Sequence, residues 1–141
     1  MKLLPLLLLL SLLPPCSAAA ATDDQVAEGI RQAEASGWWQ VGRAGDRGEW
    51  QIRRGTWRQF SSQPFSWASS VLPERRAEAR RVALAYVRWI RARLPELGLP
   101  DTPHCVALVW NAGYGHALRR EFTERNYDFA RRAATLAAIL P

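Results

Sequence analysis

Residues 1–21 constrain the fold of this chain most, because they set how much sequence is left to form a core. They contain one lysine, Lys2, then a leucine-rich run and then four alanines, Ala18 to Ala21. This pattern is typical of a secretory signal peptide, and the apolar run is short for a membrane-spanning helix. We therefore predict a signal peptide at 1–21 and one domain of about 120 residues at 22–141.

The two cysteines bear on both the location and the stability of that domain. Cys16 offers lipid anchoring as an alternative to cleavage, but Pro15 directly before it fits a lipoprotein cleavage site poorly. Without residues 1–21, Cys105 is the only cysteine, so no intrachain disulfide can form and the core must hold unaided. We expect a periplasmic or secreted monomer with no stable membrane insertion after cleavage.

The domain is basic, and its basic residues are all arginines. Residues 22–141 contain 18 arginines and 13 acidic residues, a net charge of +5, because the sole lysine lies in the leader. A charge of this size favours acidic polymers or membrane surfaces, and a bias of the coding sequence toward arginine explains it equally well. Export argues against nucleic acid as the natural partner.

Helical periodicity and capping residues predict a mainly α domain. Thr22 and Gln25 form a capping-box pattern, and apolar residues then recur at helical spacing up to a stop at Gly37. A sustained apolar stripe predicts a long central helix that starts near Pro73, is capped by Ser69 or Ser70 and ends at Pro95. The stripe consists of Ala79, Val82, Ala83, Tyr86, Ile90 and Leu94. Further helices are expected at 56–60, from Thr102 and Pro103 to a break at 111–115, and from 124–126 to 139. Residues 50–52 are expected to form at most one short strand or turn, and residues 61–70 a polar loop. Tyr127, Ala130, Ala134 and Ala137 are expected to form the packing face of the last helix.

Residues 34–57 carry the candidate chemistry. Glu34 falls in the last turn of the first helix at the edge of its apolar stripe, where burial and the helix dipole both raise a carboxyl pKa. A carboxyl that stays protonated near neutral pH can act as a general acid. Four glycines follow it and permit tight turns. Trp38, Trp39, Trp50 and Trp57 offer flat apolar faces that suit a sugar, although about half of these rings are expected to pack the loop instead.

Four short motifs in order resemble the soluble lytic transglycosylase domain of the lysozyme superfamily. They read EAS at Glu34, GEWQI at Gly48, WNAGYG at Trp110 and TERNY at Thr123. The family has a catalytic glutamate followed by serine, then glycine-x-x-glutamine, then Y-N-A-G and a tyrosine in a late helix. The chain departs from this pattern at Ala35, at Glu49 with Trp50, and at Trp110.

The resemblance implies a lysozyme-like fold with a cleft between the Glu34 region and the later helices. It implies that Glu34 is the catalytic acid and base. We expect no cofactor and no metal. The expected partner is the glycan strand of peptidoglycan, cleaved to 1,6-anhydromuramyl products. The residues expected to bind the substrate are Gly48, Trp50, Gln51, Asn111, Gly113 and Tyr127.

Other interpretations of the same residues stay open. Ordinary glycosidases use two carboxylates, and Asp46 or Glu49 is a candidate for the second in a lysozyme-type hydrolase. A non-catalytic wall-binding protein and a cationic membrane-active polypeptide are further alternatives. His104, Cys105 and His116 lack the spacing of a zinc site, so we expect Cys105 to be core packing. We expect Trp110 to lie in the core as well.

Overall fold

The computed structural model describes residues 20–141, so nearly all of the predicted signal peptide, together with Cys16, lies outside the described residues. Within 20–141 the chain forms helices and no β-strand, which confirms the mainly α prediction. No helix in this part of the chain has the length and apolarity required to cross a membrane. The elements are α1 (Asp23–Glu34), α2 (Arg54–Phe60), the 3₁₀ helix η1 (Phe65–Ser69), α3 (Pro73–Arg91), α4 (Pro103–Ala112), α5 (Tyr114–Leu118) and α6 (Glu124–Ala138).

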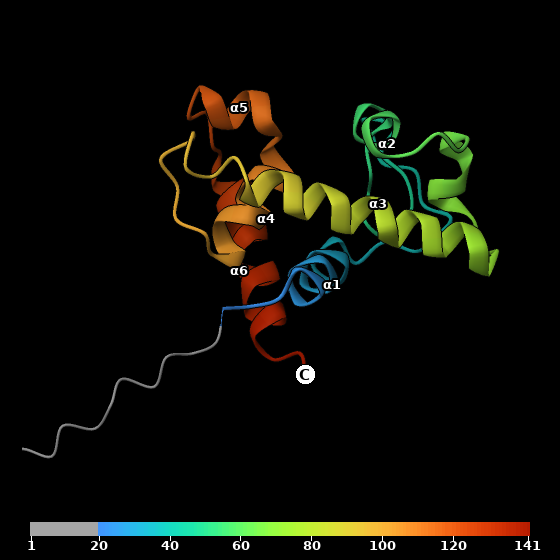
Figure 1. Cartoon of the computed structure of the whole chain (residues 1–141), viewed down its shortest axis with the longest axis horizontal. Helices are drawn as coiled ribbons and strands as arrows, with labels where there is room; N and C mark the ends of the chain where they lie inside the picture. The colour runs from blue at the N-terminus through green and yellow to red at the C-terminus, as the bar shows by residue number, and fades with distance from the viewer. Residues whose placement is uncertain (1–19) are drawn as a thin grey trace, which may run out of the picture.

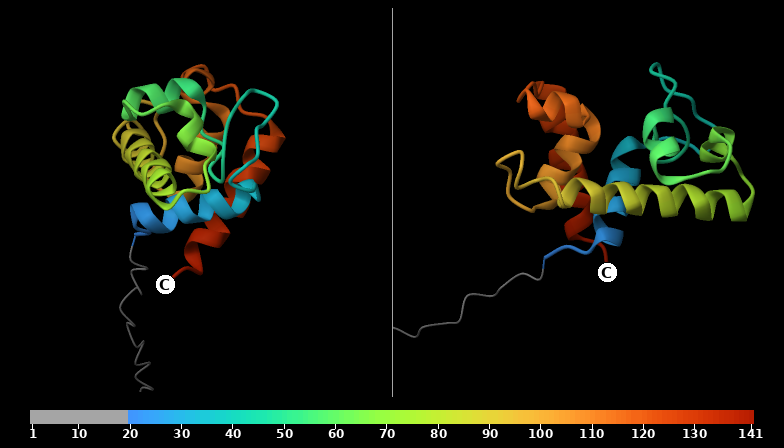
Figure 2. Two further views of the ribbon diagram at one scale, coloured as in Figure 1. Left: turned by 90° about the vertical axis from the view of Figure 1, so that its right-hand side faces the viewer. Right: turned by 45° about the horizontal axis from the view of Figure 1, so that its top comes forward.

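Helix α6 packs against both α1 and α4, and the core lies among these three helices and the longer helix α3 (Figures 1 and 2). Helices α1 and α6 approach closely at Gly29, where an added Cβ would lie 2.5 Å from the carbonyl oxygen of Ala133. Both helices begin with a complete capping box, at Thr22 and at Thr123. The predicted cap at Thr22 is therefore confirmed.

The packing face of α6 differs from the predicted one. Its buried residues are Phe129, Ala130, Ala133 and Ala137, whereas Ala134 is only partly buried and Tyr127 is 45% exposed. The apolar stripe is rotated because a face of small residues fits against Gly29 of α1, and a tyrosine would not. The prediction was right for Ala130 and Ala137 and wrong for Tyr127.

Helix α3 is the longest element, with α2 and η1 near one end and α4 and α5 near the other (Figure 1). The predicted apolar stripe is buried at Ala79, Val82, Ala83 and Ile90, as expected, with Leu94 just beyond the helix. The predicted serine cap is wrong, because Leu72 occupies the N-cap and Pro73 starts the helix without a side-chain bond. The expected polar loop also differs, because it contains η1.

Helix α4 begins as predicted, with the hydroxyl of Thr102 accepting a hydrogen bond from the Cys105 N–H at 3.2 Å. Cys105 is buried, as expected of a packing residue. The predicted break falls at Gly113, whose φ of +88° ends α4, and the chain then forms the short helix α5. Because α4 stops there, Asn111 and Gly113 lie at the end of a helix, beside the site described next.

Candidate active site

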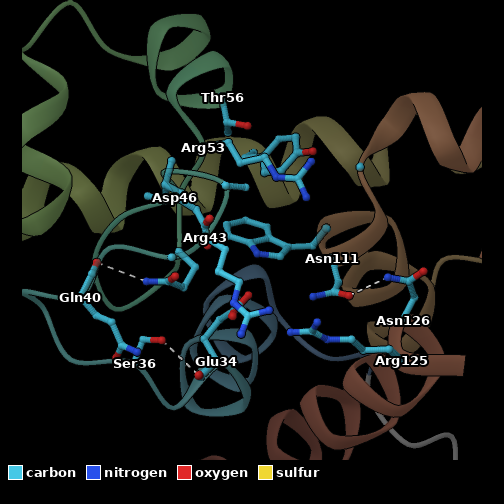
Figure 3. A pocket seen from close by; sticks show the side chains of 17 residues that line it. Glu34, Ser36, Gln40, Arg43, Asp46, Arg53, Thr56, Asn111, Arg125 and Asn126 are labelled. Atoms are coloured by element: carbon cyan, nitrogen blue, oxygen red, sulfur yellow. Dashed lines mark hydrogen bonds between the residues drawn. The ribbon is translucent and has the colours of Figure 1, made fainter. Parts of the chain in front are cut away.

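A cavity of about 690 Å³ lies between the segment that follows α1 and the helices α4 and α6 (Figure 3). Such a volume is typical of a small-molecule or oligosaccharide site. The cleft that was expected between the Glu34 region and the later helices is present. The lining residues are Glu34, Ser36, Gln40, Gly42, Arg43, Ala44, Asp46, Gln51, Ile52, Arg53, Thr56, Tyr86, Trp110, Asn111, Gly113, Arg125 and Asn126.

Glu34 is the last residue of α1 and lines this cavity. The chain leaves the helix through Ala35, whose left-handed conformation (φ 51°) turns the backbone while its N–H bonds the Gln32 carbonyl at 3.2 Å. The hydroxyl of Ser36 donates to the carbonyl oxygen of Glu34 at 3.2 Å. The helix end and these two bonds fix the backbone that carries the carboxyl.

Burial raises the pKa of the Glu34 carboxyl from 4.5 to about 7, and the negative charge of Asp46 adds to this effect. A hydrogen bond from the Trp110 side chain and the positive charges of Arg125 and Arg132 lower the pKa of Glu34, but they do not outweigh burial. The carboxyl is therefore a mixture of protonated and ionised forms at neutral pH. A group in this condition can both give and take a proton. The sequence predicted the direction and the burial, and Asp46 is the contribution it missed.

The two carboxylates considered as partners of Glu34 have different environments. Asp46 lines the cavity, and its side chain packs so closely on Gly42 that a Cβ there would overlap it. Glu49 lies outside the cavity lining, is 13% exposed and forms ion pairs with Arg31 at 3.3 Å and Arg76 at 3.0 Å. Asp46 is thus placed to influence the chemistry, whereas Glu49 ties the loop to α1 and α3.

Backbone hydrogen bonds close the segment from 40 to 52 into a compact loop. Val41 and Ile52 each form an isolated β-bridge with Arg47, so the region expected to hold a short strand or turn contains bridged turns. Gln51 has a left-handed φ of 46°, and its side-chain N–H donates to the carbonyl of Gly48 at 2.8 Å and of Gln40 at 3.4 Å. Gln51 lines the cavity, but its amide nitrogen serves the loop, which leaves its oxygen to accept from a ligand.

Asn111 faces the same cavity from the end of α4, with its orientation fixed by α6. The side-chain amide of Asn126 donates to the Asn111 side-chain oxygen at 2.8 Å, and the Asn126 oxygen accepts from the N–H of Thr123 at 2.8 Å. The cap of α6 therefore determines which way both amides point. The Asn111 NH₂ group is left with its two donors available to a ligand.

Four of the seven predicted site residues line the cavity, namely Glu34, Gln51, Asn111 and Gly113, and three do not. Gly48 is buried, with no room for a side chain against the Ala68 carbonyl. Trp50 is buried, and its indole N–H donates to the Ala27 carbonyl at 3.0 Å. Tyr127 lies on the surface of α6, where its ring stacks on His104 and contacts Phe122 edge-on. The proposed binding of substrate by Gly48, Trp50 and Tyr127 stays a prediction, and the positions of these three residues outside the cavity lining do not favour it.

The loop tryptophans also depart from the sugar-binding prediction, because none of the four lines the cavity. Trp57 is buried and donates to the Gln63 carbonyl at 2.7 Å, while Trp39 is 65% exposed. The tryptophan that does face the cavity is Trp110, which the sequence assigned to the core. Its 8% exposure fits the core assignment too, because only part of its ring reaches the cavity.

The cavity also holds side chains that were not singled out from the sequence. Asn126 directly precedes Tyr127 in the TERNY motif, and the family resemblance points to the tyrosine alone. Three arginines, Arg43, Arg53 and Arg125, come from three separate segments, so no local pattern of charge connects them. Among residues 20–141 no group of three or more histidine, cysteine, aspartate or glutamate side chains is arranged to hold a metal ion.

Comparisons of the chain with protein-family models, with curated proteins and with solved structures found no match. The function is therefore inferred from the geometry and chemistry of the cavity, together with the motif resemblance.

Proposed function

We propose that this protein is a lytic transglycosylase with a lysozyme-like fold, which cleaves the peptidoglycan glycan strand outside the cytoplasm. The observation that carries the proposal is one partly buried carboxyl, Glu34, whose pKa is raised to about 7 and which lines a cavity of about 690 Å³. The leader expected at 1–21 is what favours a site of action outside the cytoplasm.

Glu34 has the properties that both halves of such a reaction require. In its protonated form it donates a proton to the oxygen of the bond between N-acetylmuramic acid and N-acetylglucosamine. The resulting carboxylate then accepts the proton of the muramyl 6-hydroxyl as that oxygen attacks the anomeric carbon. The sugar's own hydroxyl takes the place of water, and a 1,6-anhydromuramyl product forms. A pKa near the working pH suits a group that must be an acid first and a base second.

The two amides in the cavity would orient the sugar against this carboxyl. Asn111 offers two N–H donors from a fixed helix end, and Gln51 offers a carbonyl oxygen from the loop on the other side. Donors and an acceptor on opposite walls suit the acetamido and hydroxyl groups of an N-acetylated sugar. Placing the bond over Glu34 in this way lowers the entropic part of the barrier.

One observation favours a second candidate, hydrolysis of the same bond. Asp46 lines the cavity and its charge raises the Glu34 pKa, as expected for a pair of carboxylates in one site. An ionised Asp46 could activate water or stabilise the positive charge that develops on the sugar. Glu49 does not fit this role, since it is held by Arg31 and Arg76.

Mass spectrometry of digested peptidoglycan tests the proposal and separates the two routes. We expect wild-type protein to give fragments lighter by one water than hydrolysis products. Glu34→Gln should lower the rate by a factor of about 10² to 10⁴ or more, because glutamine can neither donate nor accept the proton. Asp46→Asn should retain most activity if the 6-hydroxyl is the nucleophile.

Glu74→Gln is the matched control, because Glu74 is an exposed residue of the first turn of α3, far from the cavity lining. Products of normal hydrolytic mass, together with loss of activity in Asp46→Asn, would favour the hydrolase. Binding of peptidoglycan without any cleavage would favour a non-catalytic wall-binding protein. Full activity in Glu34→Gln would remove Glu34 from the mechanism.

A further inference from the structure

The arginines of this protein divide into those with a partner and those without. All 18 lie within residues 20–141, and eight of them form ion pairs with carboxylates. Five more form hydrogen bonds or lie over aromatic rings. In this described part of the chain, the arginine side chains with no such partner are Arg43, Arg53, Arg58, Arg125 and Arg132.

Most of the unpartnered arginines gather at one place. Arg43, Arg53 and Arg125 line the cavity, and Arg132 is near enough for its charge to act on Glu34. They come from the loop, from the N-cap of α2 and from α6, and the side chains of Arg43 and Arg125 enter the cavity from two sides (Figure 3). The Arg53 guanidinium lies over Gly113, 3.3 Å from where a Cβ would be.

The carboxyls of the cavity do not use this positive charge. Glu34 and Asp46 are the acidic residues that line it, and neither forms an ion pair with an arginine in residues 20–141. The charges of Arg125 and Arg132 lower the pKa of Glu34, but burial and the charge of Asp46 raise it by more. Three guanidinium groups therefore face the cavity with their donors free. Guanidinium groups bind carboxylates through two parallel hydrogen bonds.

We propose that Arg43, Arg53 and Arg125 bind a carboxylate group carried by the substrate, so that the cavity selects acidic over neutral glycan. This inference rests on the proposed function. The sugar backbone of peptidoglycan carries no charge as long as the lactyl group of each muramyl residue is amide-linked to its peptide. Its carboxylates belong either to the peptide attached at that group or to the lactyl group itself once the peptide is removed. The same arginine chemistry fits both sources, and all three arginines are exposed to solvent.

Three forms of one glycan preparation distinguish these sources. The first keeps its peptides with free carboxylates, the second has those carboxylates converted to methylamides, and the third has its peptides removed so that only the lactyl carboxylate remains. For wild-type protein we expect the KM of the amidated form to be about tenfold higher than that of the form with free carboxylates. This difference corresponds to the loss of roughly one charge-assisted hydrogen bond. A low KM for the third form would identify the lactyl group as the source.

Substitution of the arginines should abolish that preference. Arg43→Gln and Arg125→Gln should each raise the KM for the carboxylate form several-fold and leave the KM for the amidated form nearly unchanged. Arg58→Gln is the matched control, because it removes the same charge from an exposed, unpartnered arginine of α2 that does not line the cavity. Added salt should weaken the preference of the wild type, since exposed charges are screened.

Binding to Glu34→Gln gives a measurement that does not depend on turnover. Isothermal titration of this variant with a muramyl peptide and with its methylamide should show tighter binding of the acid. Equal KM values and equal binding for the acidic and amidated forms, with cleavage intact, would overturn the inference and leave the proposed function standing. No 1,6-anhydro product from any of the three forms would instead overturn the proposed function. If Arg58→Gln abolished the preference for the carboxylate form as fully as Arg43→Gln does, the effect would come from overall charge. That result would overturn the assignment of the preference to the cavity arginines.

Discussion

The two walls of the cavity are built differently. One wall is the helical region formed by α1, α4 and α6, which is held by buried aliphatic side chains, by capping boxes at Thr22 and Thr123 and by close packing at Gly29. The other is the loop at 35–53, which is held by isolated β-bridges, by glycines and by the side-chain amide of Gln51. Apolar packing fixes the first wall, whereas the second is anchored in the core by the buried side chains of Trp50 and Ile52 and is held elsewhere by polar contacts.

This difference matters because the proposed roles divide along it. Glu34 and Asn111 belong to helix ends, where the backbone is fixed by many contacts. Asp46, Gln51 and Arg43 belong to the loop. The loop can therefore shift the side chains that contact substrate while the end of α1 keeps the Glu34 carboxyl in place. Binding residues commonly lie on loops that a rigid scaffold positions. The predictions below test whether the two walls respond differently to substitution.

The largest effect is expected at Glu34, where the two walls meet. Its pKa in the folded protein, about 7, lies above the ordinary value of 4.5, so the folded state binds the proton more tightly. The resulting stabilisation is full below pH 4.5 and is lost as the pH rises through 7, by about 3 kcal/mol in all. Glu34→Gln stays neutral, so it should unfold at higher urea than wild type at pH 8 and at nearly the same urea at pH 5.

Equilibrium urea unfolding at the two pH values measures this difference. Glu74→Gln should show no such dependence, since that carboxyl is exposed. A Glu34→Gln effect that is the same at pH 5 and pH 8 would mean that the carboxyl is solvated in solution. The site would then lose its general acid.

A smaller loss of stability is expected where α1 crosses α6. Gly29→Ala places a methyl group 2.5 Å from the Ala133 carbonyl, so the helices must move apart, at a cost of about 2 kcal/mol for overpacking. Gly55→Ala in α2 is the control, because nothing lies near its Cβ, and alanine there should stabilise by up to about 1 kcal/mol. Thermal unfolding followed by circular dichroism compares them. An unchanged Tm in Gly29→Ala would show that the helical wall is looser than its packing indicates.

The helical wall was the part of this molecule that could be predicted. Thr22 and Thr102 were identified as caps, and Pro103, Glu34 and the break near Gly113 fell at or close to the observed helix ends. Capping side chains act within three residues, and an apolar stripe repeats along one helix, so both leave a local pattern. The rotated face of α6 escaped prediction because it depends on Gly29, about 100 residues away in the chain.

The wall formed by the loop was harder to predict, because its contacts do not recur at a regular spacing in the sequence. Trp50 and Trp57 were candidate sugar platforms, yet each donates its indole N–H to a backbone carbonyl inside the protein. Asp46 and Glu49 are both acidic residues of the same loop, so the sequence does not distinguish their roles. The ion pairs that Arg31 and Arg76 form with Glu49 are what distinguishes them. A tryptophan or carboxylate in a polar loop carries no sign of which way it faces, so tertiary contacts decide its role.

The smallest effect on stability, and the sharpest test of the two walls, is expected at Gln51. Gln51→Ala removes the side-chain bonds to the Gly48 and Gln40 carbonyls and keeps a non-glycine residue at φ 46°, so it should cost about 1 kcal/mol. Gln51→Gly loses the same bonds but relieves a left-handed conformation that disfavours other residues by about 1 kcal/mol, so its stability should stay near that of wild type. Both remove the side-chain oxygen, which the bonds of the amide nitrogen leave available to a ligand in the cavity that Gln51 lines.

Activity then separates the two possible roles of this side chain. If Gln51 contacts substrate, the alanine and glycine variants should lose activity equally, about tenfold, despite their different stabilities. If it serves only to hold the loop, Gln51→Gly should remain active and activity should follow the urea midpoint. Asn111→Ala provides the comparison from the helical wall, where the amide is held by Asn126 and does not support its own backbone. Its activity should fall at least as far, since its two free donors are lost and no loop has to rearrange.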